Sequence, residues 1–509
     1  MSDGLDPVQL QVVVGALRAT CEEMGAVLIR SAHSANIKER RDASTALFDP
    51  DGEMVMQAEH IPVHLGAMPA AVAAVLGERH EPGRSWVLND PYRGGTHLPD
   101  ITVITPVFER DGESGPGALL GFAANRAHHA DVGGPTPGSM PADSRTLADE
   151  GVVISPQPLD AEAIERLVVQ MRQPDQRRAD LRAQLAANRA GALRLAELAR
   201  TTGVAVLRAA MAEVLDYAER RARACIAALP DGTRTAHDVL EGPDGDIPLT
   251  LRATVDGDRL VLDFAGSAPQ HDGNLNCPLA VTRSACYFAV RVLTDPDIPP
   301  SAGAYRPIEV LAPEGSLLNA RSPAAVVAGN VETSSRVADL VLAAFGRALG
   351  QGTMNNLTLG TEQFTYYETL GGGQGACPDA DGPSAVHVAM SNTLNTPVEA
   401  LELEFPLRVV TYAVRRGSGG DGEFRGGEGI VRELEALSPM TWSLISERRE
   451  HAPPGAAGGG PGARGRNLLD GEPVAAKARG TLQPGARLRI ETPGGGGQGT
   501  PPSPSSPPD

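Results

Sequence analysis

Imidazole and carboxylate side chains are concentrated in one short part of this sequence. Six of its 11 histidines fall between residues 60 and 129, and acidic residues accompany them. Nitrogen and carboxylate-oxygen donors together suit Mn, Fe or Zn, and a metal ion with open coordination positions can polarise a carbonyl or lower the pKa of bound water. The distribution therefore favours a metal site. Its candidate residues are His60, His64, His80, His97, His128 and His129, with Glu59, Asp90, Asp100 and Asp131.

The densest of these groups is NDPYRGGTHLPDITVITPVF, residues 89–108. Asp90, His97 and Asp100 lie there around a Gly-Gly pair, just before a run rich in β-branched residues. Three interpretations are open: a loop that hydrogen-bonds to itself, a catalytic acid/base group, or one side of a metal site. For a single His or Asp in such a loop, capping of a turn is the commonest role. No segment matches HExxH, so spacing alone does not decide, and it is the concentration of histidines that favours the metal site.

Other motifs carry less chemistry. The Gly-rich segments LGGGQGA (370–376) and RGGEG (425–429) match neither GxxxxGK[ST] nor a strand–GxGxxG–helix unit, so tight turns are the better interpretation. Cys277 precedes a predicted helix but has only His271 nearby, and no serine lies in a GxSxG context. The sequence shows no motif for ATP, NAD or flavin, so energy for a demanding reaction would have to come from another chain.

Composition limits the partners and the compartment. A net charge of −18 repels phosphate groups, which disfavours nucleic acid and anionic membranes. The N-terminal stretch has no basic region typical of a signal peptide, and no apolar run approaches the length of a membrane span. The five cysteines are widely spaced and form no CxxC pair, which is typical of reduced thiols. We therefore expect a cytoplasmic protein.

The elements that would position the histidines are short strands. SWVLND (85–90), ITVITPVF (101–108) and LLGFAANRAHH (119–129) read as strands, and STALFDPDGEMVMQ reads as a hairpin around Asp51-Gly52. A long helix is predicted over 6–35 from its three- and four-residue apolar spacing. Because each polar group lies beside a strand or at its end, side chains from separate strands can converge.

The length of 509 residues predicts about three domains or subdomains. We expect a mixed α+β protein with a strand-rich N-terminal region that holds the candidate metal site (1–157). A long Ala/Leu/Arg-rich helical hairpin (158–230) follows, then a mixed α/β domain (231–415), a Gly-rich β region (416–492) and a disordered tail (493–509).

Long sequence blocks resemble one known family. SANIKERRD, QAEHIPVHLGAMP, NDPYRGGTHLPDITVITPVF, NRAHHADVGGPTPGSMP, NLNCPLAVTRSA, GNVETSSRVADLVLAAFG and YYETLGGGQGA occur in this order between about residues 5 and 490. Together they resemble the hydantoinase B/oxoprolinase family. This family includes the B-type subunits of N-methylhydantoinase, the corresponding half of 5-oxoprolinase and a related subunit of acetone carboxylase.

The resemblance implies a two-subunit enzyme. A hydantoinase A-type partner would carry the ATP site and activate the substrate oxygen, and the B-type chain would supply a metal site where the activated intermediate is hydrolysed. We expect the B-type subunit of an ATP-dependent cyclic amide hydrolase that acts on 5-oxoproline, a hydantoin or a related lactam in a hetero-oligomer. The alternatives are a subunit of an ATP-dependent ketone carboxylase and a non-catalytic scaffold for the A-type subunit.

The resemblance also implies the roles of individual residues. A manganese ligand set known from the acetone carboxylase relative corresponds here to Glu59, Asp90, His97, Asp100 and His128. Manganese is the expected ion, with Zn, Fe or Mg as alternatives, and the motif does not distinguish His128 from its neighbour as a ligand. Residue type suggests His129, His64 and Glu150 as groups that move a proton to the ring nitrogen.

Overall fold

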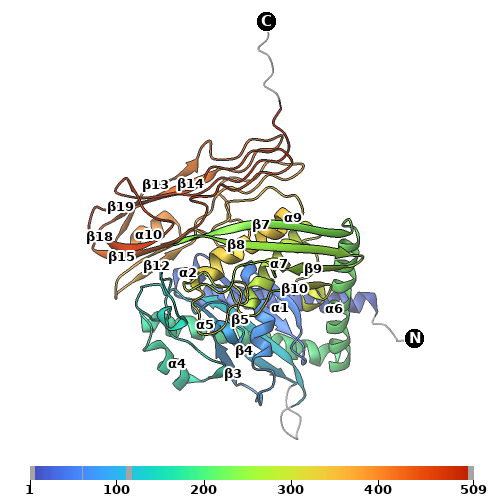
Figure 1. Ribbon diagram of the computed structural model, residues 1–509. Coiled ribbons are helices and arrows are strands. Elements are labelled where there is room, and N and C mark those ends of the chain that lie inside the picture. The colour runs from blue at the N-terminus through green and yellow to red at the C-terminus, as the bar shows by residue number, and fades with distance from the viewer. Residues whose placement is uncertain (1–5, 60, 110–116, 503–509) are drawn as a thin grey trace.

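The computed structural model describes residues 6–59, 61–109 and 117–502, without the side chains of Pro7 and Glu59. It shows a mixture of helices and several separate sheets, as expected for the mixed α+β protein that the sequence predicts. In Figure 1 the N-terminal sheet and the long helices form the lower part of the molecule, and the C-terminal strands form the upper part. The hairpin β7–β8 runs between them.

The N-terminal sheet has six strands in the order β2-β1-β5-β4-β3-β6. Alternate residues of β5 enter different cores: Phe122 and Ala124 pack in one cluster with α3 and α7, and Ala123 packs in another with α1 and α5. Since both faces are covered, the strands read as continuous apolar runs rather than as alternating patterns. The strands are β1 (Ala43–Phe48), β2 (Met54–Glu59), β3 (Ser85–Leu88), β4 (Asp100–Phe108), β5 (Leu119–His128) and β6 (Gln157–Leu159).

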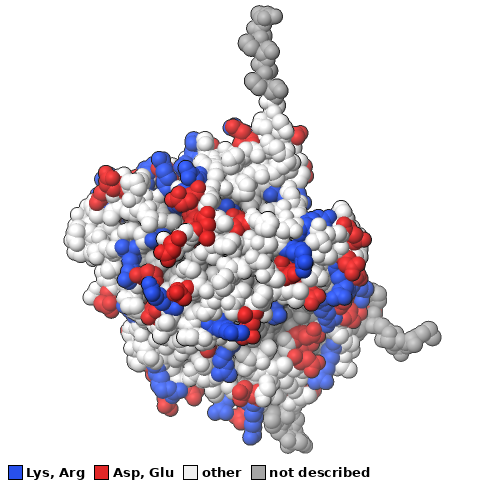
Figure 2. All heavy atoms as spheres, in the orientation of Figure 1, with Lys and Arg blue, Asp and Glu red and all other residues white. Residues whose placement is uncertain are grey.

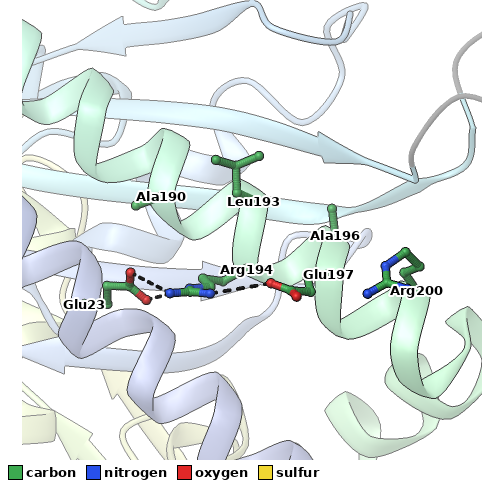
Figure 3. Close-up of a pocket in the computed structure, with 7 residues that line it drawn as sticks. All are labelled: Glu23, Ala190, Leu193, Arg194, Ala196, Glu197 and Arg200. Atoms are coloured by element: carbon green, nitrogen blue, oxygen red, sulfur yellow. Dashed lines mark hydrogen bonds and ion pairs between the residues drawn. The ribbon is translucent and has the colours of Figure 1, made fainter.

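Helices α1 (Pro7–Ser31) and α5 (Pro174–Thr202) cover one face of this sheet. They approach closely where Gly191 meets Met24, because a Cβ at Gly191 would lie 2.3 Å from the Met24 sulfur. At the surface, Arg194 of α5 bridges Glu23 of α1 and Glu197 (Figure 3). The inner face of α5 is polar as well as apolar, and its buried amides bond to the strands beneath it. The other helices and helical turns of this half are α2 (Ala35–Lys38), η1 (Pro62–His64), α3 (Ala67–Ala73), η2 (Pro91–Arg93), η3 (Leu147–Asp149), α4 (Ala161–Val168) and α6 (Val204–Ala227).

The middle of the chain forms a four-stranded sheet in the order β10-β9-β8-β7. A tight turn joins β8 and β9, where Asp256 pairs with Arg259. A π-helical turn, η4, leads directly into α9, which packs on β7 and β8. The elements are β7 (Gly232–Gly242), β8 (Gly245–Asp256), β9 (Arg259–Asp263), α7 (Leu279–Leu293), α8 (Ala302–Tyr305), β10 (Ile308–Leu311), η4 (Gly329–Thr333) and α9 (Ser334–Ala344).

The C-terminal part contains two further sheets around one apolar core. The first has the order β12-β11-β15-β18 and the second has the order β13-β14-β19-β16-β17. The elements are β11 (Asn356–Gly360), β12 (Thr365–Glu368), α10 (Val398–Glu404), β13 (Leu407–Arg415), β14 (Gly429–Ala436), β15 (Met440–Ile445), β16 (Arg466–Leu469), β17 (Glu472–Pro473), β18 (Lys477–Leu482) and β19 (Arg487–Glu491).

Glycine-rich segments from four parts of the C-terminal half pack main chain against main chain. The N–H of Gly495 donates to Gly427 O at 2.8 Å, and that of Gly497 donates to Gly460 O at 2.9 Å. A Cβ at Gly495 would lie 1.9 Å from Gln374 O, so only glycine permits this approach. Residues 493–498 are therefore buried, and the prediction that a disordered tail begins at residue 493 is wrong for them. Residues 503–509 lie outside the described part.

The surface is mixed in charge. Basic and acidic side chains are interspersed on the face in Figure 2, without a continuous basic stripe. No helix among the residues described is long and apolar enough to cross a lipid bilayer. None of the five cysteines is in a disulfide.

Candidate metal centre

Three neighbouring inner strands of the N-terminal sheet bring polar side chains together at their ends. Asp100, the first residue of β4, is the register partner of His128, the last residue of β5. Asp42 comes directly before β1, and its carbonyl accepts the N–H of His128 at 3.0 Å. Because β1, β5 and β4 are adjacent, these three residues lie side by side where the strands begin or end.

The turn before β4 places a second histidine at the same ends of the strands. Gly94 has φ +97°, and a Cβ there would lie 2.5 Å from Ala70 O. A Cβ at Gly95 would lie 2.2 Å from Asn89 O, so both glycines are required by close main-chain contacts. Buried Arg126 donates to Gly94 O at 2.7 Å and fixes the turn to the sheet. This turn presents His97 three residues before the strand.

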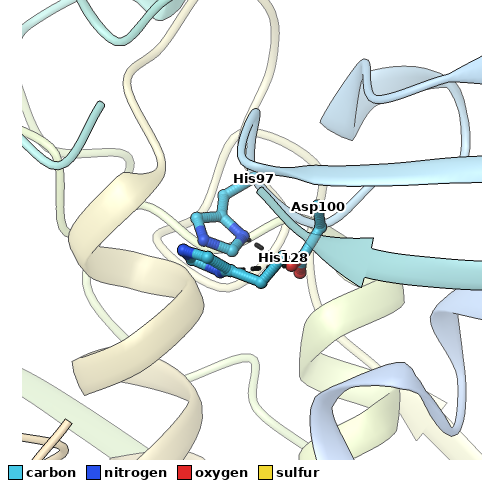
Figure 4. Close-up of side chains that lie close together, drawn as sticks. All are labelled: His97, Asp100 and His128. Atoms are coloured by element: carbon cyan, nitrogen blue, oxygen red, sulfur yellow. Dashed lines mark ion pairs between the residues drawn. The ribbon is translucent and has the colours of Figure 1, made fainter. Parts of the chain in front are cut away.

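His97, Asp100 and His128 converge on one point (Figure 4). Nδ1 of His97 lies 3.1 Å from Oδ2 of Asp100, and Nδ1 of His128 lies 3.4 Å from Oδ1. One nitrogen or oxygen from each residue lies within 4.8 Å of the others. All three residues are at most 2% exposed.

Two further residues hold the Asp100 carboxylate. Thr96 donates its hydroxyl to Oδ2 at 2.6 Å. Nε2 of His64, from η1, lies 3.5 Å from the same oxygen, while Nδ1 of His64 lies 2.9 Å from Ser44 Oγ. Asp100 therefore has a fixed orientation, with histidines on three sides.

An aromatic ring and a guanidinium cover the cluster on one side. The ring of Tyr367, from β12, stacks on His128 with 4.5 Å between centroids. Arg40 lies 4.7 Å above the Tyr367 ring and donates to the main-chain oxygen of Tyr367. The stack fixes the His128 ring and joins the N-terminal sheet to the C-terminal half.

The electrostatics of the site favour the protonation states that metal ligands need. Burial acts to raise the pKa of Asp100, but attraction to His97 and contacts with His128 and His64 outweigh it and hold the pKa well below its usual range. Burial lowers the pKa values of His128 and His64. Asp100 is therefore a carboxylate and the rings of His128 and His64 are neutral at neutral pH, which are the protonation states that metal ligands need. Burial raises the pKa of Asp42, which faces His128, Arg40 and Asp100.

The cluster has unused donor atoms that fit a bound cation. Nε2 of His97 and Nε2 of His128 are buried and have no hydrogen-bond partner among the described residues. Buried polar groups are normally paired, so such atoms indicate a missing partner. Two imidazoles and a carboxylate form a donor set that suits Mn, Fe or Zn. The cluster could thus hold a divalent metal ion.

The other residues singled out in the sequence lie elsewhere. Asp90 accepts the N–H of Tyr92 at 3.0 Å and caps η2. His129 points toward α5, with its Nε2 2.9 Å from Gln184 Oε1. Oε1 of Glu150 accepts from Ser144 and from two main-chain N–H groups, and burial raises its pKa to about 8. The side chain of Glu59 and residue 60 lie outside the described residues.

The sequence analysis did not predict three residues of the site, which are Asp42, Arg40 and Tyr367. Asp42 has the same signal as Asp100, an acidic residue directly before a buried strand, but no histidine adjoins it in sequence. Arg40 and Tyr367 are 327 positions apart, and the hydrogen bond between them depends on the packing of β12 against the N-terminal region. No local pattern in the sequence predicts that contact.

The chain belongs to the hydantoinase B/oxoprolinase family, which it matches over residues 6–501. It is 41% identical to 5-oxoprolinase 1 of Arabidopsis thaliana over 97% of this chain and 42% of that protein. It thus spans about two fifths of the length of such relatives. The B-type subunit of a putative D-/L-hydantoinase of Pseudomonas is 31% identical over 98% of this chain and 90% of the relative.

Two solved structures share the fold. The ATP-dependent caprolactamase from Pseudomonas jessenii superposes with a TM-score of 0.90 and 29% identity, covering 97% of this chain and 91% of that one. A nucleotide-free acetone carboxylase superposes with a TM-score of 0.84 and 18% identity, covering 97% of this chain and 76% of that one.

Proposed function

We propose that this chain is the B-type component of an ATP-dependent cyclic amide hydrolase. The observation that carries the proposal is the buried His97–Asp100–His128 cluster at the ends of β4 and β5, with its unpaired imidazole nitrogens. It occurs in a chain that resembles 5-oxoprolinases in sequence and, over 97% of its length, a caprolactamase in structure. The substrate class is a small lactam, such as 5-oxoproline or a hydantoin.

The chemistry explains why two components are needed. A lactam is a resonance-stabilised amide, and phosphorylation of its oxygen turns that oxygen into a good leaving group. We infer that an A-type component binds ATP and performs this activation, in a hetero-oligomer with this chain. The match to a relative named as one subunit of a hydantoinase supports such a partner.

In this proposal His97, Asp100 and His128 hold a divalent ion, with manganese as the first candidate and Zn, Fe or Mg as alternatives. The ion would polarise the substrate oxygen and lower the pKa of a bound water. The protein holds the three donors in place through Thr96 and the Tyr367 stack. Nε2 of His64, beside the Asp100 carboxylate, is well placed to hold a proton. His129 and Glu150 lie outside the cluster and would also move a proton to the ring nitrogen.

The function is tested by reconstitution with an A-type partner. We expect ATP-dependent release of the ring-opened product from 5-oxoproline or a hydantoin, loss of this activity after chelation, and recovery with Mn²⁺. Bicarbonate-dependent consumption of a ketone would instead identify a carboxylase subunit. Full activity without bound metal would support the scaffold alternative.

The five cysteines, none of them in a disulfide, support a cytoplasmic location.

A further inference from the structure

Exposed apolar side chains are concentrated in one part of the surface. Of the fourteen large apolar side chains that are exposed in the described chain, five lie between residues 394 and 437, on or beside α10 and β13 (Figure 1). The five are Leu394, Leu403, Val410, Tyr412 and Leu437. Leu403 is 88% exposed, more than any other of the fourteen. A concentration of exposed apolar side chains marks a contact with another molecule.

Main-chain contacts hold α10, β13 and the segment after β14 together. The carbonyl of Pro406, between α10 and β13, accepts the N–H of Leu437 at 2.9 Å. Oε1 of Glu402 accepts the N–H of Val409 at 2.8 Å, so the end of α10 lies against the start of β13. We call the three exposed apolar residues around this junction the α10–β13 patch: Leu403, Val410 and Leu437.

The edge of β13 is closed to a further strand at this point. β13 is an outermost strand of its five-stranded sheet, and an open edge would allow another strand to pair with it. The carboxylate of Glu402 occupies the N–H of Val409, and the pairing with β14 is shifted between Val409 and Thr411. A bulge of this kind disrupts a regular ladder. The surface is therefore suited to a contact made by side chains.

Acidic side chains surround the patch. Glu399, Glu402 and Glu404 of α10 are exposed, and none of them forms an ion pair with a residue in the described part of the chain. An apolar centre with a charged rim is the usual anatomy of a contact between proteins. A second copy of this chain would place its own carboxylates against these, which is repulsive. A partner with basic side chains around an apolar surface is complementary.

The rim stays acidic when the nearby cations are counted. On β13, Nη1 of Arg408 lies 3.5 Å from Glu435, which balances its charge. Lys38 of α2 attracts Glu404, but the adjacent Glu39 repels it. The carboxylates of α10 therefore have no surplus of cations beside them.

The same side of the C-terminal half is connected to the cover of the metal centre. Tyr412 of β13 lies against buried Arg432, with 4.4 Å between the guanidinium carbon and the ring centroid. Nη2 of Arg432 lies 3.4 Å from Oε2 of Glu368. Glu368 directly follows Tyr367, whose ring stacks on His128. Successive side-chain contacts thus join β13 to the metal centre.

We propose that the α10–β13 patch is the surface on which the A-type component docks, and that this component presents basic side chains around an apolar surface. Leu403 is the apolar anchor, and the carboxylates of α10 pair with the basic side chains. The inference rests on the proposed function, which requires an A-type component, and it gives that component a place on this chain.

The anchor is tested with a variant that leaves the fold intact. Because Leu403 is 88% exposed in the free chain, Leu403→Asp should fold with unchanged stability and metal content. Its affinity for the A-type chain used in reconstitution, measured by isothermal titration calorimetry, should fall at least about 10-fold. Leu193→Asp, at a 54% exposed position on α5, is the matched control and should bind as wild type does.

The charged rim is tested with a double variant. Glu399→Lys with Glu404→Lys should weaken binding at low salt by at least about 10-fold, and NaCl should weaken wild-type binding. Glu22→Lys with Glu78→Lys reverses two exposed carboxylates elsewhere and should leave the affinity unchanged. Wild-type affinity in Leu403→Asp or in the α10 double variant would overturn the inference. So would self-association of the free chain, seen in sedimentation velocity, that Leu403→Asp abolishes.

The binding assay needs neither substrate, ATP nor metal, so it fails independently of the proposed function. A complex that depends on Leu403 but opens no ring would remove the function and leave the docking surface. Ring opening by a complex that Leu403→Asp does not weaken would remove the docking surface and leave the function.

Discussion

Asp100 and His128 are register partners on the adjacent strands β4 and β5, so the candidate metal centre is built into a sheet rather than carried on a loop. The strand positions fix the distance between the two side chains. The Gly94-Gly95 turn then adds His97, and Tyr367 covers the His128 ring. Rigid support of this kind is what a metal site requires of its surroundings.

The two adjacent histidines of β5 should differ in their effect on metal binding. His128→Ala removes a donor from the cluster, so we expect loss of bound metal in elemental analysis. His129→Ala should retain the metal, because this ring bonds to Gln184 on α5. It should lower the free energy of unfolding by roughly 1–3 kcal/mol, since it leaves a buried amide oxygen unpaired. Retention of metal in His128→Ala would contradict the assignment.

The stack on His128 should tune metal affinity without supplying a ligand. Tyr367→Leu removes the ring that orients His128, and we expect metal affinity to fall roughly 10-fold, as for other groups that position a ligand. Tyr367→Phe keeps the ring and loses the hydrogen bond to Asn356, so it should lower stability by about 1 kcal/mol with metal affinity unchanged. Titration of the metal-free proteins with Mn²⁺ measures the metal affinity of each variant. Equal affinities in the two variants would argue against the stack.

The glycine turn should tolerate no side chain. Gly94→Ala forces a Cβ to within 2.5 Å of Ala70 O in addition to straining a positive φ. Gly83→Ala is the matched control, because Gly83 also has positive φ but a Cβ there meets open space. We expect the control to lose roughly 1–2 kcal/mol and Gly94→Ala to lose roughly 1–3 kcal/mol more. Urea unfolding measures the difference, and similar losses would show that the turn can relax.

The buried carboxyl of Glu150 should make stability depend on pH. Burial raises its pKa from 4.5 to about 8, so between these values the folded chain holds a proton that the unfolded chain has released. The free energy of unfolding therefore falls as pH rises from about 4.5 to about 8, by roughly 1.4 kcal/mol per pH unit for this group. Glu150→Gln should remove this contribution. Glu332, whose pKa is also raised to about 8, titrates in both proteins and cancels in the comparison.

Urea unfolding of wild type and Glu150→Gln at several pH values between 5 and 8 tests this. The variant should gain stability relative to wild type as pH rises. Parallel pH profiles would show that Glu150 is ionised in the folded protein, held by its three hydrogen-bond donors.

Local patterns in the sequence predict the strands and the turn well. The hairpin around Asp51-Gly52 forms as β1 and β2, and the strand predicted over 101–108 forms as β4. Short turns with Asp-Gly and buried β-branched runs are determined by neighbouring residues, so a single sequence reveals them. The family resemblance, rather than spacing, singled out His97, Asp100 and His128 among the candidate ligands.

Contacts between distant segments could not be predicted in this way. Asp42 joins the cluster only because β1 pairs with β5, and Tyr367 reaches it from β12. The segment 493–498 was misjudged because its composition resembles a disordered linker. Its stability comes from main-chain hydrogen bonds to other glycine segments, which composition does not record.

Ring opening by an Asp100→Asn chain tests the central claim most directly. The variant is combined with an A-type partner, ATP and 5-oxoproline, and bound metal, ATP consumption and glutamate release are measured on one preparation. We predict that the variant binds less than about a tenth of the wild-type metal, and that ATP consumption persists without glutamate release. Wild-type glutamate release from a metal-free Asp100→Asn complex would contradict the assignment of His97, Asp100 and His128 as the catalytic metal centre.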